Sequence, residues 1–290
     1  MRRDDLIREL DRYFWIADVQ NDDWSDIFEA LYPEPYWRDF VEPGYEGRWN
    51  GLMVRGSDEI ERVATCVFPT PEIMDGLDDG TFLFSEHPIN DAPGDLFTGL
   101  PRDTFETMRT RGIGLYHAHA PLDHHPDVSP SRLLAGALGI KDFEEYFPIA
   151  DGIPGGAAVI GGCDLTVDGI ADCLRDVLGA EIPVRVLSGS GREAGRVAVV
   201  AGGGAQVDIL EESLARGCTS YVTGNAASPC PIPEVRAGIE AFKGLAAEHR
   251  VAVVDGTHYG TEKLPQLAMV EWFSARGLEA RFVPGRPERD

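Results

Sequence analysis

Histidine and carboxylate side chains recur in three short clusters of this 290-residue chain, each directly behind an apolar run. The clusters contain Glu86 and His87, His119 and Asp123, and His258 and Glu262. Imidazole nitrogens combined with carboxylate oxygens suit divalent first-row metals such as zinc, manganese, iron, cobalt or nickel. A carboxylate that bridges two such ions would hold them a few ångström apart, and their shared water would become a nucleophile near neutral pH. The residue types therefore indicate metal-assisted chemistry.

The spacing inside any one cluster is a weak signal, and the recurrence is the stronger one. His258 and Glu262 stand four residues apart, so a helix that opens over residues 256–262 would place both side chains on one face. Such pairs are common on solvated helices, and His119 with Asp123 has the same spacing. The five cysteines are scattered without a CxxC pair, which argues against a thiolate zinc site and a disulfide scaffold.

The elements that position these clusters follow one pattern twice. Residues 62–88 and 196–225 each contain an apolar strand, a small-residue turn, an amphipathic helix and a second strand that ends in polar residues. A third strand with histidine at its end follows at 113–119 and at 251–260, and a helix comes after each. Two copies of one β–α–β…β–α pattern predict an internal duplication.

The strands of both copies are nearly continuous apolar runs, as expected for sheets covered on both faces. The fold class is therefore predicted to be α/β, with two similar three-layer domains over residues 1–145 and 146–290. In open α/β sheets, functional groups gather outside the carboxyl ends of the strands, where all three clusters are expected.

The remaining segments are predicted with less regular patterns. A first helix is expected over residues 4–13, and residues 17–50 form an aromatic, irregular segment that we interpret as a satellite core rather than a lid. A glycine-rich connection is expected at 151–162, followed by a helix with Thr166 or Asp168 as N-cap. The glycines at 202–204 lack the GK[ST] and GxGxxG patterns, so a tight turn is favoured over a nucleotide loop.

The composition limits the classes of partner. Against 26 basic residues stand 49 acidic ones, for a net charge of −23. A surface so negative repels nucleic acid and anionic membranes and attracts divalent cations, so neither nucleic acid nor membrane is expected as a partner. The N-terminal sequence MRRDDLIREL has no apolar core of a signal peptide, and no apolar run approaches a membrane span. We therefore expect a soluble, cytoplasmic protein.

Six motifs resemble those of the NIF-three-like (NGG-interacting-factor-like) proteins, also known as GTP cyclohydrolase I type 2 homologues. Residues 256–262 (GTHYGTE) are similar to the family's G-H-x-x-T-E signature, the most specific of the set. The others are WNGLMV at 49–54, VFPTPEIM at 67–74, LFSEHP at 83–88, YHAHAPLDHHP at 116–126 and YVTGN at 221–225. The resemblance covers most of the chain.

This resemblance implies two interlinked domains, with a C-terminal segment that returns ligands to a shared site, and a toroidal homohexamer whose metal sites face an internal cavity. It also implies a dinuclear metal centre with two divalent ions. Carried over residue by residue, the implied metal ligands are Glu86, His87, Asp123, His258 and Glu262. His119 matches a histidine beside the site.

Two residues depart from the family pattern. Glu86 replaces the first histidine of H-H-P, which favours harder metals and would weaken or empty one of the two metal positions. Asn225 replaces the usual aspartate, which would remove an acceptor that supports the ligands.

The resulting expectation is a dinuclear metal-dependent hydrolase, in which metal-bound water attacks a nucleotide-like or phosphorylated small molecule. In that hydrolase Glu86 or His119 would relay protons as catalytic residues, and Glu262 would bridge the ions. The alternative is a non-catalytic, ring-shaped metal-binding protein that acts as a regulator or metal chaperone, since the same ligands serve it. A third reading is a degenerate paralogue that has lost one metal through Glu86.

Overall fold

The computed structural model describes residues 1–19, 22–92, 96–230 and 232–285, which fall into two compact units. The first unit comprises Met1–Ala92, Leu96–Leu122 and residues 266–285, and the second comprises Asp123–Pro265. The chain thus passes from the first unit to the second after residue 122, earlier than the predicted division at 145, and re-enters the first unit after residue 265.

The first unit is built on a five-stranded sheet with the order β1-β6-β3-β2-β13. Strands β2, β3 and β6 are parallel, β13 joins parallel to β2, and β1 runs antiparallel to β6. The strands are β1 (Gly51–Val54), β2 (Arg62–Cys66), β3 (Phe82–Ser85), β6 (Gly114–His117) and β13 (Glu279–Phe282), with a separate antiparallel pair β4 (Asn90–Ala92) and β5 (Leu96–Thr98). The helical segments are α1 (Arg3–Tyr13), α2 (Ser25–Leu31), η1 (Tyr36–Asp39), η2 (Tyr45–Gly47), α3 (Pro71–Gly76), α4 (Arg102–Arg111) and α5 (Ala120–Asp123).

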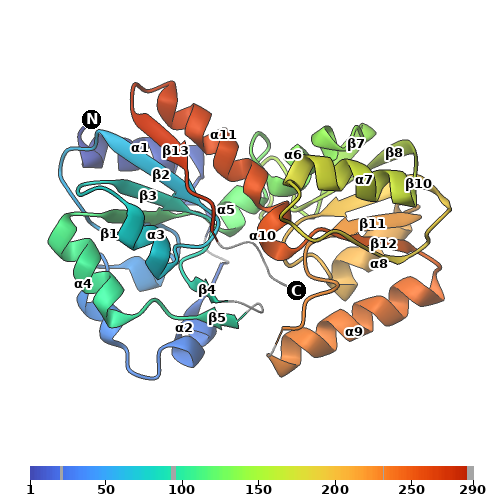
Figure 1. The fold of residues 1–290 in the computed structure, drawn as a ribbon, viewed down its shortest axis with the longest axis horizontal. Coiled ribbons are helices and arrows are strands. Elements are labelled where there is room, and N and C mark those ends of the chain that lie inside the picture. Colours follow the sequence, from blue (N-terminus) through green and yellow to red (C-terminus); the bar gives the residue numbers. More distant parts are fainter. Residues whose placement is uncertain (20–21, 93–95, 231, 286–290) are drawn as a thin grey trace. The chain divides into compact units, whose positions relative to one another are not determined.

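Helices lie on both faces of this first sheet. The ring of Phe84 in β3 stacks on Phe14 just after α1 at 5.7 Å, and meets Phe273 of α11 (Lys263–Ser274) edge-on at 5.8 Å. Helices α3 and α4 pack together on the opposite side of the sheet (Figure 1). The apolar runs of these strands are continuous because helices cover both faces of the sheet.

The second unit is built on a six-stranded sheet with the order β7-β8-β10-β11-β12-β9. Strands β10, β11 and β12 are parallel, whereas β8, β7 and β9 pair antiparallel with their neighbours. The strands are β7 (Lys141–Tyr146), β8 (Ala158–Thr166), β9 (Arg185–Ser188), β10 (Glu193–Val200), β11 (Ser220–Thr223) and β12 (Ala252–Asp255). The helices are α6 (Pro130–Ala137), α7 (Val167–Leu178), α8 (Val207–Ala215), α9 (Pro233–Glu248) and α10 (His258–Thr261).

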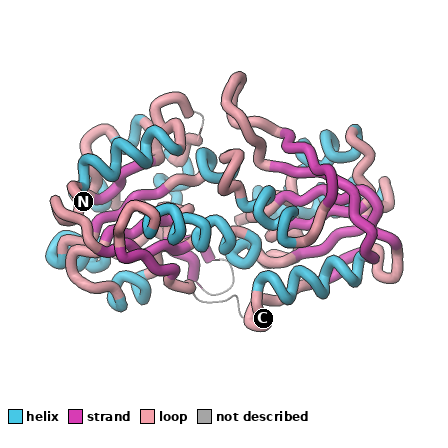
Figure 2. Tube along the Cα trace, turned by 90° about the horizontal axis from the view of Figure 1, so that it is seen from above, coloured by secondary structure: helices cyan, strands magenta, loops and turns pink. Residues whose placement is uncertain are grey.

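Helices α8 and α9 cover one face of the second sheet and α7 covers the other (Figure 1). The ring of Tyr221 in β11 packs on Phe242 of α9 at a centroid distance of 5.1 Å. Helix α7 buries an apolar stripe, and its N-cap is Thr166, whose Oγ1 accepts a hydrogen bond from the backbone N–H of Gly169 at 3.1 Å. The first of the two predicted caps is therefore confirmed. Figure 2 shows helices on both sides of the strands within each unit.

The two sheets share one arrangement at their centres. In each, three parallel strands are followed by an antiparallel strand beside the third, β2-β3-β6-β1 in the first unit and β10-β11-β12-β9 in the second. The α/β fold class is therefore confirmed, and the repeated sequence pattern corresponds to these two parallel centres. That an internal duplication produced them stays a prediction.

The predicted connection at 151–162 is wrong in its last five residues, because β8 begins at Ala158. The glycine that suggested a loop serves a close approach between strands instead. A Cβ on Gly161 would lie 2.6 Å from the backbone carbonyl oxygen of Lys141 in the neighbouring β7. A side chain at that point would force the two strands apart.

The aromatic segment before β1 is irregular, with one short α-helix and two 3-10 turns, as predicted. Its rings form a satellite core, in which Phe28 lies 4.9 Å from both Trp37 and Trp49. These three residues are all buried, so packing accounts for the aromatic composition of this stretch.

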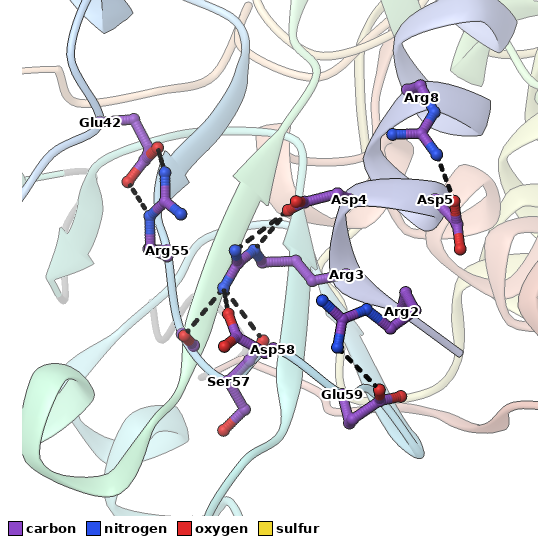
Figure 3. A network of polar contacts seen from close by, with 11 residues as sticks. Arg2, Arg3, Asp4, Asp5, Arg8, Glu42, Arg55, Ser57, Asp58 and Glu59 are labelled. Carbon is purple, nitrogen blue, oxygen red and sulfur yellow. Dashed lines mark hydrogen bonds and ion pairs between the residues drawn. The ribbon is translucent and has the colours of Figure 1, made fainter.

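The N-terminal helix is tied to the loop between β1 and β2 by a buried arginine (Figure 3). Arg3 is 4% exposed, and its guanidinium donates to Asp58 at 2.6 Å and to Asp4 at 3.0 Å. It also donates to the backbone carbonyls of Gly56 and Ser57, each at 3.4 Å. The planar fork of donors therefore connects α1 to three acceptors in the loop between β1 and β2, in addition to its helix neighbour Asp4. Across the part of the chain that is described, every helix is too short or too polar to cross a bilayer.

Candidate functional site

In the second unit, three glycine-containing loops leave the carboxyl ends of the parallel strands β10, β11 and β12. Because these strands run in the same direction, the loops meet at one edge of the sheet, where ligand sites of α/β proteins form. Gly202 follows β10, Gly224 follows β11 and Gly256 follows β12. A Cβ on Gly224 would lie 2.8 Å from the backbone carbonyl oxygen of Gly202, so the first two loops touch.

The short helix α10 follows β12 and carries the predicted ligands. Thr257 starts it with a left-handed φ of +64°, and its Oγ1 accepts from the backbone N–H of Gly260 at 3.0 Å. Thr261 Oγ1 accepts from the N–H of Gly202 at 2.8 Å, which fixes α10 against the loop after β10. This single turn places His258 Nε2 at 2.9 Å from Glu262 Oε1, so the predicted four-residue pair does share one face.

Asp123 joins this pair within the second unit. Its carboxylate oxygen lies within 4.8 Å of a carboxylate oxygen of Glu262, as does a ring nitrogen of His258. Glu262 is 3% exposed, while Asp123 and His258 are partly buried. Ligands bound at about 2.0–2.2 Å to one cation lie at most about 4.4 Å apart, so the Asp123–Glu262 pair and the His258–Glu262 pair are each close to the spacing that a cation needs. The structure thus brings two of the five predicted ligands, Asp123 and His258, close to a third, Glu262.

The glycine turn after β10 makes room for this carboxylate. Gly202 has a left-handed φ of +58°, and a Cβ built on it would stand 1.7 Å from Glu262 Oε1. A Cβ on Gly203 would meet only His258 Cε1, at 3.9 Å. The predicted tight turn is confirmed, but the sequence did not indicate its second role, which is to accommodate the side chain of Glu262.

Two buried polar residues stabilise the loops around α10. Asp255 accepts hydrogen bonds from the N–H groups of Ala227 at 3.0 Å and Thr257 at 3.2 Å. Burial raises the pKa of Asp255, although these backbone hydrogen bonds oppose the rise. Asn225 Oδ1 accepts from the N–H of Ala205 at 2.8 Å, so the asparagine supplies an acceptor at the position where the resemblance implies aspartate.

In the first unit, Glu86 and His87 follow β3 directly and are 0% and 3% exposed. Glu86 Oε2 accepts a hydrogen bond from Gln266 Nε2 at 3.4 Å. The His87 ring stacks on Phe68 with a centroid distance of 4.2 Å and an interplanar angle of 5°. A carboxylate buried so completely is costly unless cations or hydrogen-bond donors compensate it, and this pair is therefore no ordinary surface turn.

His119, the predicted proton relay, lies close to His87 in the first unit, with 5.0 Å between the ring centroids. Its Nδ1 is 3.2 Å from both carboxylate oxygens of Asp22. The pKa of Asp22 lies well below its usual range: burial would raise it, but the charge of His119 and the hydrogen bonds to the carboxylate outweigh that effect. Sequence reasoning missed Asp22, which stands 97 residues from His119 in a segment without a period.

The donor atoms of both units fit the same class of ion. The first unit offers Glu86 and His87, and the second offers Asp123, His258 and Glu262. Imidazole nitrogen with carboxylate oxygen suits zinc, manganese, iron, cobalt and nickel, as predicted from the sequence. All five cysteines are free thiols, and none of them is among the predicted metal ligands.

Comparison with known proteins gives consistent results. The family model Duf34/NIF3 (NGG1p interacting factor 3) matches residues 40–284. A Deinococcus radiodurans protein named GTP cyclohydrolase 1 type 2 homolog is 28% identical over 290 residues, which are 97% of this chain and 88% of that protein. Among solved structures, the protein ybgI, of unknown function, aligns with a TM-score of 0.69 and 18% identity over 100% of both chains. A crystal structure from Thermus thermophilus aligns with a TM-score of 0.60 and 25% identity over 97% of both.

Proposed function

Because this chain belongs to the Duf34/NIF3 family, we propose that it is a metal-dependent hydrolase that acts on a nucleotide-like or phosphorylated small molecule. The observation that carries the proposal is the convergence of Asp123, His258 and Glu262 at the carboxyl edge of the second sheet. The substrate class rests on the name GTP cyclohydrolase 1 type 2 homolog, which belongs to the Deinococcus relative.

In this proposal Asp123, His258 and Glu262 would hold a divalent ion, and the family resemblance would assign Glu86 and His87 to a second. The contribution of the first unit rests on the family resemblance and on the chemistry of its buried donors. Bound divalent ions supply Lewis-acid stabilisation of developing negative charge and lower the pKa of water.

His119 takes the role of proton acceptor and donor in the proposed reaction. It is a partly exposed imidazole whose side chain is 27% exposed, so protons can exchange with solvent. It lies beside His87 and is anchored by Asp22, and geometry of this kind orients a general base. Glu86 is the second candidate for proton transfer, although its complete burial favours a role as ligand.

The alternative function is a non-catalytic metal-binding protein that regulates or transfers metal. One observation favours it: the net charge of −23 repels anionic nucleotides and attracts cations. The same ligand residues would serve this function.

We also propose that the protein forms a homohexameric ring in the cytoplasm. This assembly rests on the family resemblance. Light scattering on the purified protein tests it, since a mass of six chains is expected and a monomer would contradict it.

Protein purified without chelators tests the function directly. Elemental analysis should give two metal ions per chain, whereas one ion would indicate that Glu86 has weakened one position. The metal-loaded protein is then assayed on a panel of nucleotides and phosphoesters, with Asp123→Ala as the ligand variant. Asp127→Ala is the matched control, because Asp127 is an exposed carboxylate four residues further along the chain, after the end of α5. Turnover lost only in Asp123→Ala supports the hydrolase, and tight metal binding without turnover supports the alternative.

A further inference from the structure

Asp22 is held by more donors than a surface carboxylate usually has. Besides His119 Nδ1, it accepts from Trp24 Nε1 at 3.1 Å and Asn50 Nδ2 at 2.9 Å. The backbone N–H of Ala120 adds a further bond at 3.1 Å, and the Asp22 side chain is only 11% exposed. A carboxylate fixed by three donors of its own has little freedom to turn, so it presents its oxygens to the imidazole in one orientation.

The imidazole is fixed from the other side as well. The backbone N–H of His119 donates to Asn50 Oδ1 at 2.8 Å, so Asn50 bonds both the carboxylate and the histidine main chain. Trp24 meets the His119 ring edge-on, with 4.8 Å between centroids and an interplanar angle of 83°. Asp22 Oδ1 and Oδ2 are both 3.2 Å from Nδ1, so the carboxylate faces this nitrogen symmetrically.

We propose that Asp22 is a positioning residue, which holds His119 in the tautomer with its proton on Nδ1 and so makes Nε2 the nitrogen that accepts protons. A carboxylate accepts hydrogen bonds and donates none, so it favours a protonated Nδ1. In neutral imidazole the lone pair then lies on Nε2. The catalytic consequence rests on the proposed hydrolase function, whereas the tautomer itself does not.

The carboxylate of Asp22 comes from the aromatic segment before β1. The family model begins its match at residue 40, so Asp22 and Trp24 lie in the segment before it, while His119 and Asn50 lie within it. The aromatic segment therefore does more than pack: it carries a carboxylate to a histidine of the matched region.

Nitrogen NMR on protein with ¹⁵N-labelled histidine tests the proposal in the absence of metal. Protonated and unprotonated ring nitrogens give separate signals, and a His119→Gln spectrum identifies those of His119. In the wild type at a pH where the ring is neutral, we expect a protonated Nδ1 and an unprotonated Nε2. In Asp22→Asn we expect a mixture of tautomers, and in Asp22→Ser likewise. Asp23→Asn, the same change at an exposed neighbour, should leave the spectrum unchanged.

Two results would overturn the positioning role: a wild-type ring protonated on Nε2, or an Asp22→Asn ring with the wild-type tautomer. The wild-type spectrum decides alone if the variants do not fold. In the turnover assay, Asp22→Asn should lower kcat about 100-fold with little change in KM, as expected for an impaired general base. An altered tautomer with unchanged kcat would refute the catalytic consequence. Absence of turnover in the wild type would instead reject the proposed hydrolase and leave the tautomer test intact.

Discussion

Gly202→Ala is the sharpest test of Glu262 as a metal ligand. The new Cβ would stand 1.7 Å from Glu262 Oε1 and 2.7 Å from its carboxyl carbon, distances that no packed structure tolerates. Because the carboxylate is the end of a flexible side chain, we expect it to rotate away while the fold persists. The left-handed φ of +58° adds about 1–2 kcal/mol of backbone strain for alanine.

The two effects separate in two assays. In metal-free protein, urea unfolding should show a loss of about 1–2 kcal/mol from the backbone strain. In metal titrations by calorimetry or chelator competition, affinity should fall at least about 10- to 100-fold, the range known for loss of groups that only support metal ligands. The loss of affinity thus exceeds what the loss of stability explains.

Gly203→Ala is the matched control. Its Cβ would meet only His258 Cε1 at 3.9 Å, an ordinary contact, and its backbone is not left-handed. We expect its metal affinity to match the wild type. If Gly202→Ala also binds metal with wild-type affinity, then the position of the Glu262 carboxylate has no bearing on metal binding and our reasoning about this edge of the sheet is refuted.

Three further predictions concern stability. Arg3→Met should lower the free energy of unfolding in urea by about 1–3 kcal/mol, because the carbonyls of Gly56 and Ser57 lose a buried donor. Asp58→Ala should lower it by less than about 1 kcal/mol, since Asp58 is exposed. Equal losses in the two variants would contradict this account. Burial lowers the pKa of His117 from 6.5 to about 3, so the unfolded chain takes up a proton first and stability should fall as pH drops from about 6.5 towards 3. In urea unfolding at several pH values, His117→Gln should lessen the dependence of the free energy of unfolding on pH. An unchanged dependence would exclude His117 as its source. Removal of metal by a chelator should lower Tm. Metal added back at about 100 times its Kd should raise the free energy of unfolding by about 2.7 kcal/mol. A Tm that does not change with metal would contradict a metal site that favours the folded state.

The sequence predicted the strand-end clusters because two physical signals coincide there. Continuous apolar runs mark strands buried on both faces, and parallel strands bring their carboxyl ends to one edge. The sequence alone therefore places His258 and Glu262 at that edge. Their four-residue spacing also predicted a shared face, which α10 provides with a single turn.

Other features left little trace in the sequence. The edge strand β7 is mostly exposed, so its residues KDFEEY show no apolar run. Gly161 and Gly202 both suggested loops. In the structure Gly161 lets β7 approach β8, and Gly202 leaves space for the Glu262 carboxylate. Such close approaches depend on residues far away in the chain. The pairing of Asp22 with His119 likewise depends on tertiary structure across 97 residues, which no local periodicity encodes.

The return of the chain to its first unit has a consequence for biosynthesis. Strand β13 pairs with β2, so the edge of the first sheet stays open until residues 279–282 have been synthesised. Until then β2 offers unpaired backbone groups to any other strand, which is a known route to aggregation. A nascent chain of this protein therefore cannot complete its units in the order of translation, and a chain truncated near residue 265 would have an incomplete first sheet.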